Sequence, residues 1–227
     1  MTMLSNALLL LLQIGPPVLD GMTMSHSPGE LLVPAREVCE TFGFPIHVNR
    51  LGVMRIAGKF IGDYHPVNTD GAVYLPARDF KKWNLNVAWD KSTRLTTISK
   101  GDKSLVYRVG AKSVLIDKST QLLFAKQGDR VVMKSKVSTG KFAGSTPNGT
   151  FKALSKQRVN YSSLYDNAPM PYSVQVVGTI FIHGYKSVPD VPASHGCIRL
   201  PLPDAAEFFF DWVELGTPIK ISGRWKK

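Results

Sequence analysis

A short motif occurs twice in the N-terminal half of the chain, and this repeat limits the possible folds more than any other feature. Val-Pro-Ala-Arg-Glu at residues 33–37 returns as Leu-Pro-Ala-Arg-Asp at residues 75–79. In each copy the proline suits the first turn of a helix, where its missing N–H costs nothing, and the helix dipole stabilises the carboxylate three residues later. The repeat therefore predicts two short helices, opened by Pro34 and by Pro76.

Extended segments surround both predicted helices. We expect a strand and a turn before each helix and an extended segment after it, at residues 17–21 and 44–48 for the first copy and at 68–74 and 85–89 for the second. The second copy continues through a polar turn into a β-rich strand at 94–98. Each unit thus reads strand, turn, helix, strand, and two such units can share one hydrophobic core.

The C-terminal half has a different pattern. Apolar or alternating runs at residues 114–117, 121–124 and 130–137 are separated by turns rich in Asp, Lys, Ser and Gly. Strands of this length and spacing predict a β-sandwich or a barrel.

A helix is expected only near the C-terminal end of this half. Pro203 suits its first turn, Gly216 closes it, and a last strand is expected at 217–221. The apolar face of this helix comprises Ala205, Phe208, Phe209 and Trp212. The resulting fold class is mainly β with short helices, an N-terminal α+β repeat domain being followed by a β-sandwich-like domain.

The chain is strongly basic, with a formal net charge of +11, which favours an acidic partner. The Lys and Arg residues are spread along the sequence with one dense cluster at 224–227, and no zinc-finger or RNA-binding signature accompanies them. We therefore expect an anionic matrix, such as a wall or membrane surface, as the partner, and not nucleic acid.

Two cysteines, Cys39 and Cys197, occur in the chain. Cys39 follows the i, i+3, i+4, i+7 pattern of the first predicted helix, with Ala35, Val38 and Phe42, so we interpret it as a buried structural thiol. A disulfide between the two cysteines would consume Cys197, which is the candidate reactive residue.

Two histidines precede Cys197 at positions that suit nucleophilic chemistry. Residues 194–199 read Ser-His-Gly-Cys-Ile-Arg, and His183 follows an apolar strand upstream. A thiolate that attacks an amide needs a lowered pKa, a base or imidazolium nearby, and donors for the developing oxyanion. The residues alone leave two alternatives open: buried histidines beside a core cysteine, or a zinc site from His183, His195 and Cys197 that lacks a convincing fourth ligand. Papain-like peptidases place Cys before His, which is the reverse of this order.

These motifs resemble the catalytic domain of the L,D-transpeptidases of the YkuD type. The signature of that family is an upstream His-Gly, here at 183–184, followed by Ser-His-Gly-Cys and then Arg. Residues 115–122 resemble the opening strands of the family. Residues 137–141 and 146–151 resemble its Ser-Thr-Gly and Thr-Pro-x-Gly-x-Phe elements, and residues 170–172 resemble the segment that leads to the first histidine.

The resemblance covers residues 112–222 and implies roles for individual residues. Cys197 would be the nucleophile and His183 the general base and acid, with the carbonyl of Gly184 orienting the imidazole. Backbone N–H groups of His195, Gly196 and Cys197 would form the oxyanion hole.

The same resemblance implies the substrate-binding residues. Arg199 would pair with a carboxylate of the donor stem, Ser194 would brace the loop beside it, and Tyr172 would belong to the substrate site. The alternative for Arg199 is a surface ion pair. The ten residues between His183 and Ser194 form a shorter loop than in many members of the family, and this departure affects the expected substrate lid.

The implied activity is the cross-linking of peptidoglycan. The cysteine attacks the carbonyl of the third residue of a tetrapeptide stem, expels D-Ala, and passes the acyl group to a side-chain amine of a neighbouring stem, which gives a 3→3 cross-link. No cofactor and no metal is implied, and we expect a monomer exported to the periplasm or the cell wall. Two alternatives stay open: an L,D-carboxypeptidase or D-amino-acid exchange enzyme with the same site, and an inactive wall-binding protein.

Residues 15–110 resemble the N-terminal domain of copper amine oxidases, which also occurs in many bacterial wall proteins. The resemblance rests on the paired Pro-Ala-Arg helices and on Val-Ala-Trp-Asp at 87–90. His26, His47 and His65 lack ligand spacing, so we expect no metal site. This half is expected either to dock the chain on the wall or to act as a spacer.

Residues 1–14 include five consecutive leucines at 8–12, a run too short to span a bilayer. It resembles the apolar part of a signal peptide, but no Lys or Arg precedes it and no small-x-small cleavage site follows. The segment alone leaves open whether it is a signal remnant, a first strand or the product of a mis-assigned start.

Overall fold

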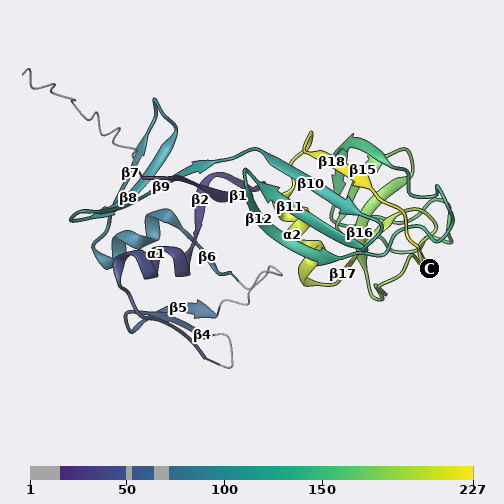
Figure 1. Ribbon diagram of the computed structural model, residues 1–227. Helices are drawn as coiled ribbons and strands as arrows, with labels where there is room; N and C mark the ends of the chain where they lie inside the picture. Colours follow the sequence, from purple (N-terminus) through teal and green to yellow (C-terminus); the bar gives the residue numbers. More distant parts are fainter. Residues whose placement is uncertain (1–15, 50–52, 64–71, 227) are drawn as a thin grey trace, which may run out of the picture.

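The computed structural model describes residues 16–49, 53–63 and 72–226, which form two lobes joined side by side (Figure 1). The possible signal remnant at residues 1–14 and His65 lie outside the described residues, as does part of the segment expected at 68–74.

The N-terminal lobe contains a six-stranded sheet and a three-stranded sheet. The strands of the larger sheet are β1 (Val18–Met24), β2 (Ser27–Pro34), β6 (Tyr74–Pro76), β7 (Asn86–Asp90), β8 (Leu95–Lys100) and β9 (Lys103–Val109). Their order is β6-β2-β1-β9-β8-β7. The smaller sheet consists of β3 (Ile46–Val48), β4 (Val53–Ile56) and β5 (Lys59–Asp63).

Two short helices accompany these sheets, as the repeat predicts. The first, α1 (Ala35–Phe42), follows Pro34 and ends at Gly43, whose φ of 74° is the left-handed conformation that favours glycine. The second copy of the motif forms a 3₁₀ helix, η1 (Ala77–Trp83), and ends at Asn84 with a φ of 59°.

Both helices bury their apolar side chains in one shared core. Val38 and Cys39 of α1 lie in the same cluster as Phe80 and Trp83 of η1. The predicted burial of Cys39 is confirmed, and this burial raises the pKa of its thiol to about 11.

The turn that we expected near residue 20 is wrong. Strand β1 continues through Asp20 to Met24 and pairs antiparallel with β2 and parallel with β9. The buried Asp20 carboxylate accepts hydrogen bonds from Arg108 Nε at 2.7 Å and from the backbone N–H of Asp129 at 2.8 Å. These partners offset the cost of placing a charge inside a strand.

Strand β1 also joins the two lobes. Met22 packs in the core of the C-terminal lobe, and the backbone N–H of Thr23 donates to Gln127 Oε1 at 3.1 Å. From the other side, Arg130 Nη2 donates to the Glu37 carboxylate at 3.0 Å. Buried apolar and polar contacts therefore hold the lobes together.

The C-terminal lobe contains two further sheets. The first comprises β10 (Lys112–Asp117), β11 (Leu122–Gln127), β12 (Arg130–Lys136), β13 (Gly149–Lys152) and β18 (Pro218–Ser222), in the order β12-β11-β10-β18-β13. The second comprises β14 (Ser155–Gln157), β15 (Ser173–Val177), β16 (Ile180–Tyr185) and β17 (Ile198–Pro201), in that order. Side chains of both sheets share one core, which confirms the predicted fold class.

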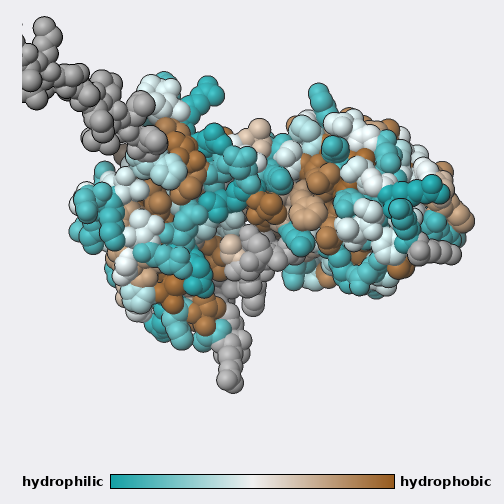
Figure 2. Space-filling model, in the orientation of Figure 1, coloured by the Kyte–Doolittle hydropathy of each residue, from teal (hydrophilic) through white to brown (hydrophobic). Residues whose placement is uncertain are grey.

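The remaining helix, α2 (Asp204–Trp212), follows Pro203 and contributes Phe209 and Trp212 to this core. The helix ends at Trp212 rather than at Gly216, which instead turns the chain toward β18 with a φ of 86°. Within the described part of the chain, no helix is long and apolar enough to cross a membrane. Figure 2 shows apolar residues of this face in small separate patches on both lobes.

Strands β16 and β17 position the candidate site. They pair in parallel, with His183 opposite Arg199. A parallel pair requires a crossover connection, and here the connection ends in residues 194–197, which we call the catalytic loop. The topology therefore brings the upstream histidine next to the Ser-His-Gly-Cys motif.

Candidate active site

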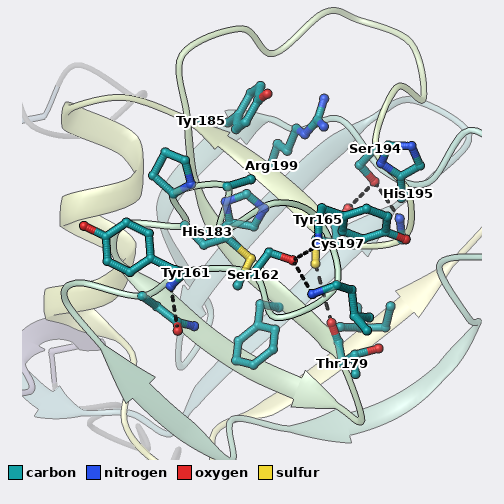
Figure 3. Close-up of a pocket in the computed structure, with 18 of the residues that line it drawn as sticks. Tyr161, Ser162, Tyr165, Thr179, His183, Tyr185, Ser194, His195, Cys197 and Arg199 are labelled. Carbon is teal, nitrogen blue, oxygen red and sulfur yellow. Dashed lines mark hydrogen bonds between the residues drawn. The ribbon is translucent and has the colours of Figure 1, made fainter.

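One cavity of about 440 Å³ in the C-terminal lobe gathers most of the residues singled out from the sequence (Figure 3). His183 enters it from β16 and Arg199 from β17, while Ser194, His195 and Cys197 belong to the catalytic loop. The two histidines and the cysteine therefore share one solvent-accessible space.

The imidazole of His183 is held in a single orientation. The ring is buried, and Nδ1 lies 3.0 Å from the carbonyl oxygen of Gly184. A carbonyl can only accept, so Nδ1 carries the proton and Nε2 is left as an acceptor. Burial lowers the pKa of His183 to about 4. The hydrogen bond to Gly184 raises this pKa, whereas the positive charge of Arg199 lowers it further. The ring is therefore neutral at pH 7.

The thiol of Cys197 is also neutral in this arrangement. Burial raises the pKa of Cys197, although a backbone hydrogen bond from Phe181 and the charge of Arg199 oppose the effect. This is the reverse of the lowered pKa that we expected. The thiol lies 3.6 Å from the carbonyl oxygen of Thr179, and among the described residues no hydrogen bond joins it to His183.

Hydrogen bonds inside the catalytic loop fix its shape. Ser194 Oγ donates to the carbonyl of Cys197 at 2.6 Å and accepts the backbone N–H of Gly196 at 3.0 Å. The expected bracing role of Ser194 agrees with these bonds. The Gly196 N–H, which we expected in the oxyanion hole, already donates to Ser194 Oγ and is therefore not available to a substrate. Within the described part of the chain, the N–H groups of His195 and Cys197 have no such partner.

Gly196 is required by a close approach of two chain segments. A Cβ at this position would lie 2.9 Å from the carbonyl oxygen of Ser145 and 2.9 Å from Ile180 Cδ1. On the same side, Thr146 Oγ1 donates to the Gly196 carbonyl at 2.6 Å. The Thr-Pro-x-Gly element thus supports the catalytic loop from behind.

Arg199 presents a charge to the cavity without a carboxylate partner among the described residues. Its guanidinium lies 4.0 Å from the centre of the Tyr185 ring, and Nη1 makes one long contact of 3.4 Å to the carbonyl of Ala193. The surface ion pair that we considered is therefore not present in this region. The remaining donors of the guanidinium suit a carboxylate on a ligand.

Two predicted site residues lie outside the cavity lining. Gly184 packs behind the site against Leu202, where its carbonyl holds His183. Tyr172 contacts Phe210 edge-on, with ring centres 5.9 Å apart, and lies under the guanidinium of Arg158. The ring of Tyr172 thus packs between Arg158 and Phe210 and does not face the cavity.

A wall of the cavity that the sequence did not reveal comes from residues 160–170. Tyr165 stacks on His195 with ring centres 4.6 Å apart and an interplanar angle of 19°. Tyr161 and Leu164 line the same wall and are exposed. The sequence signal for this wall was a group of aromatic and apolar residues, Tyr161, Leu164 and Tyr165, within an otherwise polar loop.

No three His, Cys, Asp or Glu side chains of the described ranges come close enough to hold a metal ion. The site consists of a thiol, an imidazole, a guanidinium and backbone donors, and these groups can carry out acyl transfer.

Comparison with known proteins agrees with this site. The family model for the L,D-transpeptidase catalytic domain (YkuD) matches residues 111–221, and the model for the copper amine oxidase N-terminal domain matches residues 55–137. The second match begins later than we expected and runs into β10, β11 and β12 of the C-terminal lobe.

One relative and two solved structures are among the proteins to which this chain is similar. L,D-transpeptidase 1 of Mycobacterium tuberculosis is 27% identical over 91% of this chain and 86% of its own length. An L,D-transpeptidase structure from Xylanimonas cellulosilytica is 27% identical, with a TM-score of 0.44, over 50% of this chain and 61% of that chain. One from Mycobacterium smegmatis is 20% identical, with a TM-score of 0.46, over 92% and 96%.

The chain is therefore similar to the L,D-transpeptidase (YkuD) family over residues 111–221 and to the copper amine oxidase N-terminal domain over residues 55–137, a region that precedes and overlaps the first match.

Proposed function

We propose that the protein is a peptidoglycan L,D-transpeptidase that forms 3→3 cross-links through a Cys197 thioester and releases D-Ala. The observation that carries the proposal is the single cavity that holds a thiol, an imidazole with a free Nε2, and a guanidinium available to a ligand. The mycobacterial relative named L,D-transpeptidase 1 supports the same activity.

Acylation would begin from two neutral groups. The Cys197 thiol turns from the Thr179 carbonyl toward His183, and Nε2 takes its proton while Sγ bonds to the carbonyl carbon of the third stem residue. Because burial disfavours both a thiolate and an imidazolium, proton transfer accompanies the attack. The negative charge develops on the substrate oxygen, where the N–H groups of His195 and Cys197 can stabilise it.

Collapse of this intermediate breaks the bond to D-Ala. The imidazolium of His183 gives its proton to the departing amine, and the positive charge of Arg199 favours that loss. A side-chain amine of a neighbouring stem then attacks the thioester, His183 accepts the proton of that amine, and the proton returns to the sulfur of Cys197. One thioester is exchanged for one amide, so no nucleotide is consumed.

Recognition would use a charged part and an aromatic part of the cavity lining. Arg199 offers a charged fork for a carboxylate of the donor stem, and the exposed rings of Tyr161 and Tyr165 cover its apolar parts. Peptidoglycan stems of this kind mature outside the cytoplasm, so we place the protein in the periplasm or at the wall. The net charge of +11 suits an anionic wall surface.

Purified disaccharide-tetrapeptide tests the proposal directly. The protein is incubated with this substrate, the products are separated, and their masses are determined by mass spectrometry. Loss of D-Ala together with dimers supports transpeptidation, whereas loss of D-Ala without dimers identifies a carboxypeptidase. Cys197→Ala should abolish both products, and Cys39→Ala, which removes the other thiol, should retain them. Turnover by Cys197→Ala, or none by the wild type, would refute the proposal.

A further inference from the structure

A second cavity, of about 380 Å³, adjoins the catalytic loop from behind. We call it the basic pocket, and its wall includes Lys118, Lys141, Phe142, Thr146, Arg224 and Trp225. The backbone N–H of Lys141 donates to the Ser194 carbonyl at 2.9 Å, so one wall of the pocket is hydrogen-bonded directly to the catalytic loop. Neither Cys197 nor His183 lines this cavity, so its occupant is not the reacting stem.

Three cations converge on the basic pocket without an opposing carboxylate. No Asp or Glu lines it, and Lys118, Lys141 and Arg224 take part in none of the ion pairs among the described residues. By contrast, Arg130 and Arg158 of the same lobe are paired with carboxylates. Lys141 Nζ lies 5.0 Å from the centre of the Phe142 ring, a contact that leaves its charge without a neutralising carboxylate. Positive side chains that line one cavity without a carboxylate favour binding of an anion.

Lys118 is held at the wall of the basic pocket by a hydrogen bond. Its Nζ donates to the carbonyl of Thr146 at 2.6 Å, which aims the ammonium along the wall of the pocket. Burial lowers the pKa of Lys118. A bound anion would offset that cost, because an opposite charge nearby stabilises the protonated amine.

The number of cations in the basic pocket favours a phosphate over a carboxylate. One arginine fork satisfies the two oxygens of a carboxylate. A phosphate group carries more charge and three strong acceptor oxygens, which matches three separate cations. The ring of Phe142, which is 63% exposed and has the Lys141 ammonium over one face, and the ring of Trp225 add flat apolar surface beside these charges. Such surface packs against a sugar ring.

We propose that the basic pocket binds the phosphate group of a sugar phosphate, with the two aromatic rings against the sugar. The pocket includes Arg224 and Trp225, which follow β18, and the yellow segment after β18 runs along the end of the C-terminal lobe that faces away from the N-terminal lobe (Figure 1). A phosphate-bearing saccharide polymer can therefore reach it while a peptide stem occupies the catalytic cavity. This site goes beyond the proposed transpeptidation and does not depend on it.

Isothermal titration of the full chain at low ionic strength tests the site with four probes: glucose 1-phosphate, inorganic phosphate, glucuronate and glucose. Glucose 1-phosphate should bind one per chain, and inorganic phosphate more weakly. Glucuronate should bind roughly tenfold more weakly than glucose 1-phosphate, and glucose should not bind. Glucuronate affinity equal to that of glucose 1-phosphate, or no saturable binding of glucose 1-phosphate, would overturn the proposal.

Matched variants locate the site. Removing two of its charges with Lys141→Gln and Arg224→Gln together should weaken glucose 1-phosphate at least tenfold. Lys226→Gln removes a neighbouring exposed charge that does not line the pocket, and Arg199→Gln removes the cation of the catalytic cavity. Both should bind as the wild type does. Loss of binding in Arg199→Gln, or unchanged binding in the double variant, would show that the phosphate sits elsewhere.

Discussion

The neutral state of His183 predicts a specific dependence of stability on pH. Burial holds its pKa at about 4 in the folded chain, against an ordinary value of 6.5. Below pH 6.5 the unfolded chain therefore binds a proton that the folded chain refuses, and unfolding is favoured as the pH falls. Above pH 6.5 neither state is protonated, so this contribution disappears.

The size of the effect follows from the two pKa values. Each unit of difference is worth about 1.4 kcal/mol, so the folded state loses about 3 kcal/mol between pH 7 and pH 4 through this one group. Little discount for solvent applies, because the His183 side chain is only 4% exposed.

Urea denaturation at half-unit steps of pH from 7.5 to 4 measures this loss. His183→Asn removes the titrating group. Relative to this variant, the wild type should therefore lose about 3 kcal/mol of unfolding free energy as the pH falls from 7 to 4. His195→Gln, which replaces the exposed histidine of the same cavity, is the control. If the unfolding free energies of the wild type and of His183→Asn run parallel within about 1 kcal/mol over this range, the folded chain does not hold the pKa of His183 near 4.

Other perturbations have equally direct readouts. Asp20→Ala removes the carboxylate that accepts hydrogen bonds from Arg108 Nε and from the backbone N–H of Asp129, and it should cost about 2 kcal/mol in urea denaturation, because the half-exposed Arg108 keeps Asp129 as a partner; a loss below about 0.5 kcal/mol would argue against a structural role for this carboxylate. Gly196→Ala drives a Cβ to 2.9 Å from the Ser145 carbonyl and should slow acylation by a carbapenem about 100-fold in a chain that still folds; wild-type rates would contradict the tight contact. Tyr165→Ala removes the stack on His195 and should raise KM for the tetrapeptide roughly fivefold with kcat nearly unchanged; an unchanged KM would exclude this ring from binding.

The parts of the fold that could be predicted depend on neighbours in the sequence. Pro34 and Pro76 mark helix starts through local backbone chemistry, and the burial of Cys39 follows from helical periodicity. The meeting of His183 with the catalytic loop was accessible through the family resemblance, because the motif residues are themselves the signature.

The parts that could not be predicted depend on partners distant in the chain. Asp20 reads as a turn residue until Arg108 and Asp129 are seen to satisfy it inside β1. The 3₁₀ form of the second helix likewise has no separate signal, since its motif matches that of α1. Local propensity gives way wherever a tertiary contact supplies more free energy.

The electrostatics of the site show the same limit. The expected lowered pKa of Cys197 came from the chemistry that a thiolate requires, whereas the actual direction depends on how deeply the fold buries the sulfur. The Gly196 N–H is likewise consumed by the Ser194 hydroxyl, a contact that depends on the loop conformation. Tyr172 belongs to a recognisable segment, yet its ring faces Phe210 rather than the cavity.

In the proposed reaction Cys197 carries the acyl group, and the second cysteine of the chain provides an internal control for locating it. The protein is trapped by acid shortly after mixing with disaccharide-tetrapeptide, and peptide mapping by mass spectrometry locates the added mass. We expect the mass of the stem without D-Ala on the peptide that contains Cys197, and none on the peptide that contains the buried Cys39. An adduct on Cys39 or on any other side chain, with Cys197 unmodified, would contradict this expectation.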